Sequence, residues 1–266
     1  MNDRIATDIA PFVRRDVDAR GVITLTLDRP QSFNALSEGM LTALQGELDA
    51  IAADETARAV VIAATGKAFC AGHDLKEMRA EPSLPYYEAL FAQCARMMLT
   101  IQRLPVPVIA RVQGIATAAG CQLVAACDLA VAADSARFAV SGVNLGLFCS
   151  SPSVPLVRNV ARKPAFEMLV TGEFISADEA RARGLVNRVA SMEALDGAVE
   201  SLVAAIVAKP RSAIALGKAL FYRQIERGAE AAYEDAARTM ACNMMEADTL
   251  EGVQAFIDKR KPAWPS

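Results

Sequence analysis

Two stretches of small residues could hold a negatively charged oxygen with main-chain groups alone. In the first, Ala118, Ala119 and Gly120 leave the start of an expected helix almost bare of side chains. The first N–H groups of a helix lack partners within it and carry a partial positive charge, so a ligand oxygen can bind there. Close packing between helices also selects Ala and Gly, so this alternative stays open.

The second stretch is the loop from residue 67 to 76, which has the same design of small residues between a strand and a helix. It contains Gly72 and the one histidine of the chain, His73. If the fold brings this loop to the turn at 115–120, N–H groups from both would form an oxyanion site. Such a site stabilises the enolate of a thioester.

The elements that must position these loops alternate between strands and helices. Residues 105–134 predict a strand, the tight turn, a buried helix from 121 to 127 and a strand at 129–132. Alternation predicts a strand at 22–28, and an apolar run predicts another at 60–64. Ser37 is expected to cap a helix that reaches about residue 54, and residues 86–104 predict a long amphipathic helix.

The last part of the chain is predicted to be helical. A capping box at Ser176 and Glu179 opens a helix that stops at Gly184, and a second box is expected at Asp248 and Glu251. Strand–helix alternation followed by helices indicates an α/β core with a helical tail, and the break is expected near Ala190.

Composition limits the function classes. The chain has 266 residues, of which 53% are hydrophobic, and a net charge of −3, which suits one large domain, or one domain with an appendage. Mild acidity argues against a nucleic-acid partner. The most apolar region is interrupted by polar residues, so we expect no membrane span. With a single histidine, a multi-histidine metal site within one chain is excluded.

Cysteine usage and the N-terminus predict a cytoplasmic location. Six cysteines are scattered without CxxC spacing, mostly in apolar segments, as in the reduced core of a cytoplasmic protein. Residues 1–16 have no apolar core for a signal peptide, and Asp3 and Asp8 argue against a transit peptide.

Four motifs in a fixed order carry a family resemblance that spans about residues 22–264. They are KAFCAGHDLKEM, GIATAAGCQLVAACDLAVAAD, TGEFISADEARARGLVNRV and EGVQAFIDKRKPAW. Together they resemble the crotonase, or enoyl-CoA hydratase/isomerase, superfamily. Within it, the chain looks most like the branch whose members are named for containing an enoyl-CoA hydratase domain.

The resemblance implies a fold and an assembly. The expected fold is α/β, a crotonase-like spiral of β-β-α units over residues 1–190. A C-terminal helical trimerisation region is expected over residues 191–266. The assembly would be a homotrimer or a dimer of trimers. The expected ligand is a small-molecule acyl-CoA of fatty acid metabolism, with coenzyme A as part of the substrate and no other cofactor.

The resemblance also assigns site residues. The two oxyanion donors fall on the backbone N–H groups of His73 and Ala119. The segment that follows the first donor borders the CoA thioester and comprises Asp74, Leu75 and Lys76. Phe256 and Lys259 match positions that touch the adenine and phosphate end of CoA from a neighbouring subunit. For Lys259, a solvated helix-end lysine is an equally good interpretation.

The sequence departs from the hydratase pattern at both catalytic glutamates. The first falls on Gln122, one helical turn after Ala119, so its side chain is expected to point into the pocket. The second falls on Gly142. An amide neither gives nor takes a proton near neutral pH, and glycine has no side chain. Since each acid–base group contributes ~10²–10⁴ in rate, hydration should be very slow.

Several residues could replace the glutamates, and the sequence favours none of them. They are the imidazole of His73, Glu77, and Cys149 with Ser150 in the opposite loop. Cys149 is more often a core residue, because reactivity requires a lowered thiol pKa.

Three functions therefore stay open. The first is an enoyl-CoA hydratase/isomerase-type enzyme that acts through the oxyanion site. The second is a malonyl- or methylmalonyl-type CoA decarboxylase, in which loss of CO₂ forms the enolate without a carboxylate base. The third is a protein that binds acyl-CoA without turning it over.

Overall fold

Pairs of strands followed by helices build the body of the molecule. The computed structural model describes residues 11–80 and 82–264. Three times along the chain, a strand of one sheet is followed directly by a strand of a second sheet: β3 by β4, β5 by β6 and β7 by β8. This repetition is the predicted spiral of β-β-α units, and the C-terminal helices are present as well. Residues 1–10, which belong to the segment predicted to contain no signal or transit peptide, lie outside the described residues.

Ten strands form the two sheets. The six-stranded sheet has the order β1-β2-β3-β5-β7-β10, and its strands run parallel except for the β1–β2 pair. In that order, the strands are Val13–Val17, Val22–Leu27, Ala59–Ala64, Val108–Val112, Leu129–Ala133 and Arg188–Ala190. The four-stranded sheet has the order β4-β6-β8-β9 and consists of Ala68–Cys70, Ile115–Thr117, Arg137–Ala139 and Ile175–Ser176.

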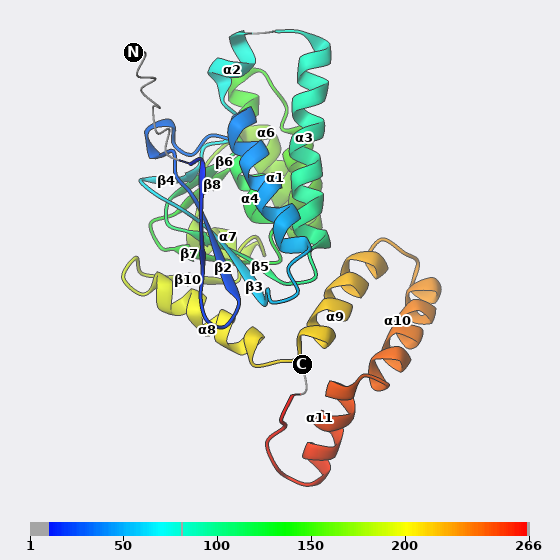
Figure 1. Ribbon diagram of the computed structural model, residues 1–266. Helices are drawn as coiled ribbons and strands as arrows, with labels where there is room; N and C mark the ends of the chain where they lie inside the picture. Colours follow the sequence, from blue (N-terminus) through cyan, green and yellow to red (C-terminus); the bar gives the residue numbers. More distant parts are fainter. Residues whose placement is uncertain (1–10, 81, 265–266) are drawn as a thin grey trace, which may run out of the picture.

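Helices cover the sheets and continue beyond them (Figure 1). In the described residues they are α1 (Glu38–Ala52), α2 (Leu75–Ala80), α3 (Leu84–Arg103), α4 (Ala119–Ala126), α5 (Ser150–Asn159), α6 (Arg162–Thr171), α7 (Ala177–Ala182), α8 (Leu195–Val207), α9 (Arg211–Gln224), α10 (Ala229–Met244) and α11 (Ala247–Ile257). Among these residues, no helix combines the length and apolar character that crossing a bilayer requires.

The main hydrophobic core lies between the six-stranded sheet and α1, α3 and α4. All six residues of β3 are buried, as expected for a strand covered on both faces. On the other face of the sheet, Leu195, Val199 and Val203 of α8 pack in a second cluster with strand residues such as Val61. The division at residue 190 stays a prediction, but α8, which lies beyond it, packs against the sheet.

Local capping explains where several helices begin. Ser37 caps α1 by accepting from the N–H of Met40 at 3.2 Å, as predicted. The capping box of Ser176 and Glu179 is formed in both directions. The second predicted box is wrong: α11 begins at Ala247, and Asp248 instead accepts from the hydroxyl of Ser212 at 3.0 Å.

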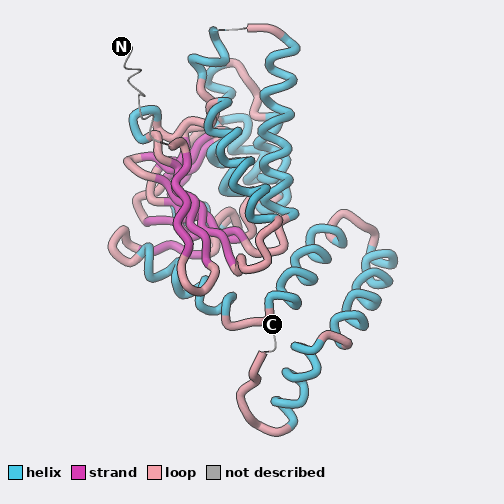
Figure 2. Tube along the Cα trace, in the orientation of Figure 1, coloured by secondary structure: helices cyan, strands magenta, loops and turns pink. Residues whose placement is uncertain are grey.

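The last three helices and the tail, residues 211–264, form what we call the arm. The arm extends away from the body of the molecule (Figure 2). Neither α9 nor α10 has a fully buried residue, so burial of side chains in this chain does little to hold the arm in place.

Polar contacts fix the arm to the body. The side chain of Lys218 in α9 is only 7% exposed and donates to the carbonyls of Ile101 and Val106, both at 2.9 Å. It also lies 2.6 Å from the carboxylate of Asp128, which accepts from the hydroxyl of Tyr222 at 2.7 Å. The ammonium of Lys218 therefore has three acceptors, and every contact crosses from the arm to the body.

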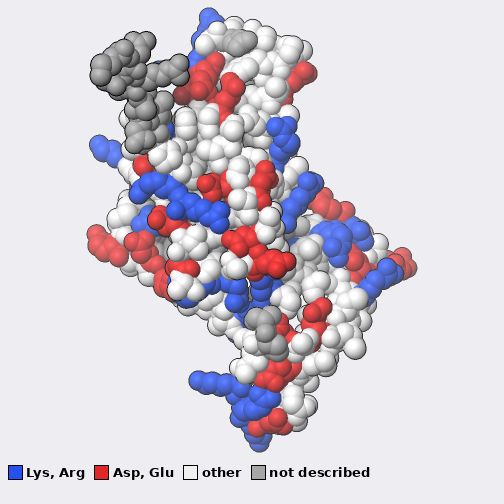
Figure 3. Space-filling model, in the orientation of Figure 1, with Lys and Arg blue, Asp and Glu red and all other residues white. Residues whose placement is uncertain are grey.

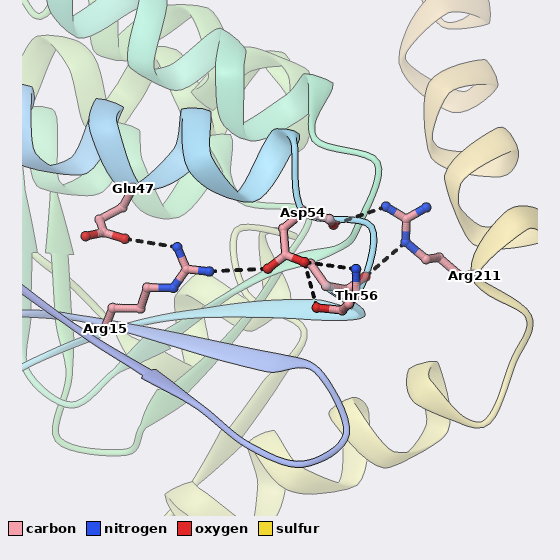
Figure 4. Close-up of polar contacts among 6 residues, drawn as sticks. Arg15, Glu47, Asp54, Thr56 and Arg211 are labelled. Carbon is pink, nitrogen blue, oxygen red and sulfur yellow. Dashed lines mark hydrogen bonds and ion pairs between the residues drawn. The ribbon is translucent and has the colours of Figure 1, made fainter. Parts of the chain in front are cut away.

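A second set of contacts lies where α9 begins. Arg211 donates to the carbonyls of Ala57 at 3.1 Å and Asp54 at 3.4 Å. The carboxylate of Asp54 also contacts Arg15 and accepts from Thr56, so the turn after α1 is held from both sides (Figure 4).

Charges of both signs are interspersed over the face shown in Figure 3. The positive group at the lower end of this view lies where α11 ends, and the sequence there has three exposed cations, Lys259, Arg260 and Lys261. This face therefore carries no broad basic stripe.

Candidate functional site

The two loops predicted to supply the donors lie side by side. Strands β4 and β6 pair in parallel, so the residues that follow each strand emerge at one edge of the sheet. Gly72 has a φ of +94°, and a Cβ added to it would lie 3.3 Å from the backbone nitrogen of Ala119. A side chain at position 72 would therefore enter the space between the two loops.

Main-chain contacts hold both loops. The carbonyl of Gly72 accepts from the N–H of Leu36 at 2.7 Å, which ties the first loop to the segment before α1. In the second loop, the N–H of Ala118 donates to the carbonyl of Ala139 at 3.0 Å. Both loops are thus positioned by neighbouring backbone.

The start of α4 is strained and tightly packed. Ala118 precedes the helix with a φ of 51° and a ψ of −120°, a conformation that side chains disfavour. A Cβ on Gly120 would overlap the carbonyl oxygen of Cys70. The close-packing interpretation of the small residues therefore applies to Gly120, whereas Ala119 faces a cavity.

That cavity has a volume of about 370 Å³ and contains both predicted donor residues. Six further residues line the cavity: Met78, Phe91, Leu145, Leu147, Phe148 and Pro152. Their roles could not be predicted from the sequence, because they resemble ordinary core or loop residues. A more open groove of about 510 Å³ lies between strands β1–β3 and α8, and no predicted site residue lines it.

His73 lies on the wall of the cavity with its ring held in place. Its Nδ1 is 3.3 Å from the carbonyl oxygen of Leu36. The ring of Phe91 meets it edge-on, with centroids 5.4 Å apart. Burial lowers the pKa of His73 below its usual value, and the contact with the Leu36 carbonyl opposes this shift only in part. The imidazole is therefore neutral at neutral pH.

The two positions of the missing glutamates differ. Gly142 lines the cavity, but Gln122 does not, contrary to the expectation that its side chain points there. Gln122 is only 3% exposed, and its Oε1 has no hydrogen-bond partner among the described residues. The reason is that α4 is buried along its whole length, so its neighbours enclose this face of the helix.

Cys149 and the backbone before it occupy the space beside Gly142. A Cβ at position 142 would lie 2.5 Å from the carbonyl oxygen of Leu147 and 2.8 Å from the sulfur of Cys149. The N–H of Gly142 donates to that sulfur at 3.3 Å. Burial raises the pKa of the Cys149 thiol, and the Gly142 N–H opposes the shift. Cys149 therefore stays a thiol.

The three residues after the first donor, Asp74, Leu75 and Lys76, have different surroundings in the structure. Leu75 lines the cavity. Asp74 does not; its carboxylate accepts from the N–H groups of Lys76 at 2.9 Å and Glu77 at 3.3 Å, which caps α2. The side chain of Lys76 is exposed at the surface. Asp74 thus has a structural task in addition to the predicted one.

Phe256 and Lys259 lie on the arm, and neither lines this cavity. Phe256 is 85% exposed, and Lys259 follows α11 with a left-handed φ of 55°. The chain does not bring them to its own cavity, so their predicted contact with CoA requires a neighbouring subunit.

The cavity is electrically neutral. None of the described residues that line it is Asp, Glu, Lys or Arg, and their titratable side chains are those of His73 and Cys149. Among residues 11–80 and 82–264, no three His, Cys, Asp or Glu side chains are placed to hold a metal ion. The arrangement can thus offer main-chain donors and one imidazole to a bound molecule.

Related sequences resemble the chain over most of its length. It is 47% identical to enoyl-CoA hydratase domain-containing protein 3, mitochondrial, of Xenopus laevis, with 92% of this chain and 83% of that protein covered. The human protein of the same name is 43% identical, with 96% and 83% covered. The resemblance to this branch of the family is confirmed.

The relatives contradict the predicted cytoplasmic location. The proteins from frog, rat, mouse and human that match the chain are all named as mitochondrial. Cysteine usage could not have made this distinction, because unpaired thiols exclude only oxidising compartments.

Solved structures share the fold, and a family match covers most of the chain. A crystal structure of an enoyl-CoA hydratase from Mycobacterium smegmatis has a TM-score of 0.96 and 68% identity, covering 97% of this chain and all of that one. Human enoyl-CoA hydratase domain-containing protein 3 has a TM-score of 0.92 and 42% identity, covering 95% and 100%. Residues 18–266 match the family described as enoyl-CoA hydratase/isomerase. The chain therefore belongs to the enoyl-CoA hydratase/isomerase family.

Proposed function

We propose that this protein is an enzyme that binds an acyl-CoA thioester and stabilises its enolate between two main-chain N–H groups. The donors are those of His73 and Ala119. The observation that carries the proposal is the meeting of their loops at one cavity, where a Cβ on Gly72 would approach the nitrogen of Ala119 to 3.3 Å. Glycine at position 72 keeps this space free for a ligand oxygen.

The position of Ala119 adds to the donor strength of its N–H. As the first residue of α4, it has no acceptor for its N–H within the helix, and the helix dipole favours negative charge at this end. The strained Ala118 that precedes it is the kind of backbone outlier found at functional sites. Loss of one oxyanion donor costs ~10²–10³ in rate in enzymes where it has been measured.

Efficient hydration is not part of this proposal. Hydration requires one group to activate water and one to deliver a proton, and neither Gln122 nor Gly142 can do either. The space beside Gly142 is filled by Leu147 and Cys149, so the missing carboxylate has not left an empty place. Chemistry that needs only an enolate and one base fits the cavity better.

The test offers the purified protein crotonyl-CoA, a 3-enoyl-CoA and methylmalonyl-CoA, with products followed by mass spectrometry. We expect conversion of the 3-enoyl-CoA and little hydration of crotonyl-CoA. Binding of a saturated acyl-CoA is measured in parallel by calorimetry. Hydration as fast as in a two-glutamate enzyme would contradict the proposal, and so would an absence of binding.

Two alternatives are resolved by the same experiment. Binding without any product identifies a non-catalytic acyl-CoA binding protein. Release of CO₂ from methylmalonyl-CoA identifies a decarboxylase, although the absence of a cationic side chain on the cavity wall gives a substrate carboxylate no partner.

We further propose that the chain assembles as a homotrimer or a dimer of trimers. The arm leaves large apolar side chains uncovered, including Tyr233 at 79%, Met240 at 71% and Phe256 at 85% exposed. Exposed apolar area on this scale is typical of an interaction surface. Light scattering coupled to size-exclusion chromatography measures the assembly, and a monomer at micromolar concentration would contradict it.

A further inference from the structure

The cavity contains two side chains that could exchange a proton with a bound molecule. They are His73 and Cys149, since no carboxylate, lysine or arginine lines the walls. Glu77, a further candidate from the sequence, is not among the lining residues, and its carboxylate accepts from the N–H of Glu38 at 3.0 Å. The choice of a base therefore lies between an imidazole and a thiol.

The surroundings of Cys149 suit a proton-bearing thiol. Its sulfur is buried and accepts a hydrogen bond from the N–H of Gly142 at 3.3 Å. Burial disfavours the charged thiolate, and the thiolate is the form that would accept a proton.

The surroundings of His73 leave one ring nitrogen able to accept a proton. The carbonyl oxygen of Leu36 can only accept a hydrogen bond, so the Nδ1 that lies 3.3 Å from it must carry the proton. In the neutral ring, the lone pair then resides on Nε2, for which no partner exists among the described residues. The edge-on contact with Phe91 fixes the plane of the ring.

We propose that the imidazole of His73 is the catalytic base of this site. The inference rests on the proposed function. In the proposed complex, the N–H of the same residue holds the thioester oxygen, and His73 lines the cavity in which the acyl group would lie. The cavity wall of Leu75, Met78, Phe91 and Phe148 suits an uncharged chain.

A single base is enough for the proposed step. Nε2 removes a proton from the carbon next to the thioester carbonyl, and the electron pair of the broken C–H bond forms the enolate. The negative charge then rests on the oxygen between the two N–H groups. With the thioester carbonyl carbon as C1, the imidazolium returns the same proton to C4, the far carbon of the former C3=C4 double bond. The electron pair of the enolate then forms the new C2=C3 double bond, which is conjugated with the carbonyl. The protein regains its starting state without a co-reactant.

The substitution His73→Asn isolates the base. Asparagine keeps the main-chain N–H and offers a side-chain N–H to the Leu36 carbonyl, but it has no counterpart of Nε2. We expect isomerisation of a 3-enoyl-CoA to fall ~10²–10⁴-fold while the affinity for a saturated acyl-CoA is unchanged. In D₂O, exchange of the hydrogens beside the thioester carbonyl of butyryl-CoA should fall by the same factor.

Two further variants keep the proposal falsifiable. Cys149→Ser alters the cavity wall but should lose far less of the exchange than His73→Asn, and free imidazole should partly restore the exchange to His73→Ala. Thermal melting of each variant confirms that it is folded. Unchanged exchange in His73→Asn, or a comparable loss in Cys149→Ser, would overturn the assignment of His73 and leave the proposed function standing. Wild-type protein that binds butyryl-CoA without exchange also overturns it, whereas an absence of binding overturns the proposed function itself.

Discussion

The body and the arm of this molecule are held by different forces. In the body, all eight residues of α4 are buried. In the arm, no residue of α9 or α10 is fully buried. Its polar contacts with the body include those of Lys218, Tyr222, Arg211 and Glu226. Burial of apolar surface stabilises the first region, whereas a few charge-assisted hydrogen bonds orient the second. The arm therefore leaves apolar surface exposed, which the proposed assembly would cover.

The largest effect is expected from removing the charge that anchors the arm. Lys218→Met leaves the buried carboxylate of Asp128 without its cation, which should lower the free energy of unfolding by about 3–5 kcal/mol. Chemical denaturation measures this change. Lys209→Met is the matched control, because that side chain is exposed and the hydrogen bonds of this residue, with Arg58 and Ile206, are made by its backbone.

A loss below about 1 kcal/mol in Lys218→Met would show that this contact behaves as a surface pair. The arm would then be oriented by the contacts of Arg211 or by apolar burial in an assembly.

Two glycine substitutions compare packing in the two regions directly. Gly120→Ala in α4 places a Cβ on the carbonyl of Cys70 and should cost about 1–3 kcal/mol or more, with loss of activity. Gly217→Ala in α9 meets no atom within 4 Å and should stabilise the helix by about 0.5–1 kcal/mol. Thermal melts with calorimetry compare both with wild type. Destabilisation by Gly217→Ala would indicate that another chain packs closely on α9.

The pH dependence of stability sharpens the description of the body. Because burial lowers the pKa of His73 in the folded state, the unfolded chain binds a proton more readily. Its contribution to stability is fully present above the usual pKa of 6.5 and is lost as the pH falls below that value. In wild type, the free energy of unfolding should therefore fall between pH 7 and pH 5.5, and His73→Asn should remove the part of this fall that His73 causes. Chemical denaturation of both proteins at the two pH values measures it. An identical slope in both proteins would contradict the buried neutral imidazole.

The smallest effect on unfolding is expected on the surface of the arm. Met240→Gln replaces a side chain that is 71% exposed and should change the stability of the single chain by less than about 0.5 kcal/mol. It should nevertheless weaken the proposed self-association. Sedimentation at several concentrations measures this, with Leu84→Gln, 70% exposed and outside the arm, as the control. Equal association of both variants would place the interface elsewhere.

Regular elements with strong local signals could be predicted from the sequence. The alternation in β2, the apolar run of β3 and the Ser37 cap of α1 all appear where expected. Strands β4 and β6 were missed, because three residues are too few for a periodic pattern and pairing across the second sheet defines them. The capping box at Asp248 is wrong, because α11 begins at Ala247 with Glu246 before it, so that Asp248 lies within the helix, where it accepts from Ser212.

The site was predictable in part for the same reason. Small residues at 118–120 and Gly72 marked both loops, and the structure brings the loops to one cavity. The surroundings of Gly142 and Gln122 could not be foreseen, because they depend on how Leu147 and Cys149 fold back and on what encloses α4. The roles assigned to His73, Ala119 and the CoA contacts stay predictions until the experiments above are done.

The tail of the arm returns to the point where the arm begins. The indole N–H of Trp264 donates to the carbonyl of Ala208 at 3.1 Å, between α8 and α9. Because this is the sole tryptophan of the chain, its fluorescence reports on that junction without background from other indoles.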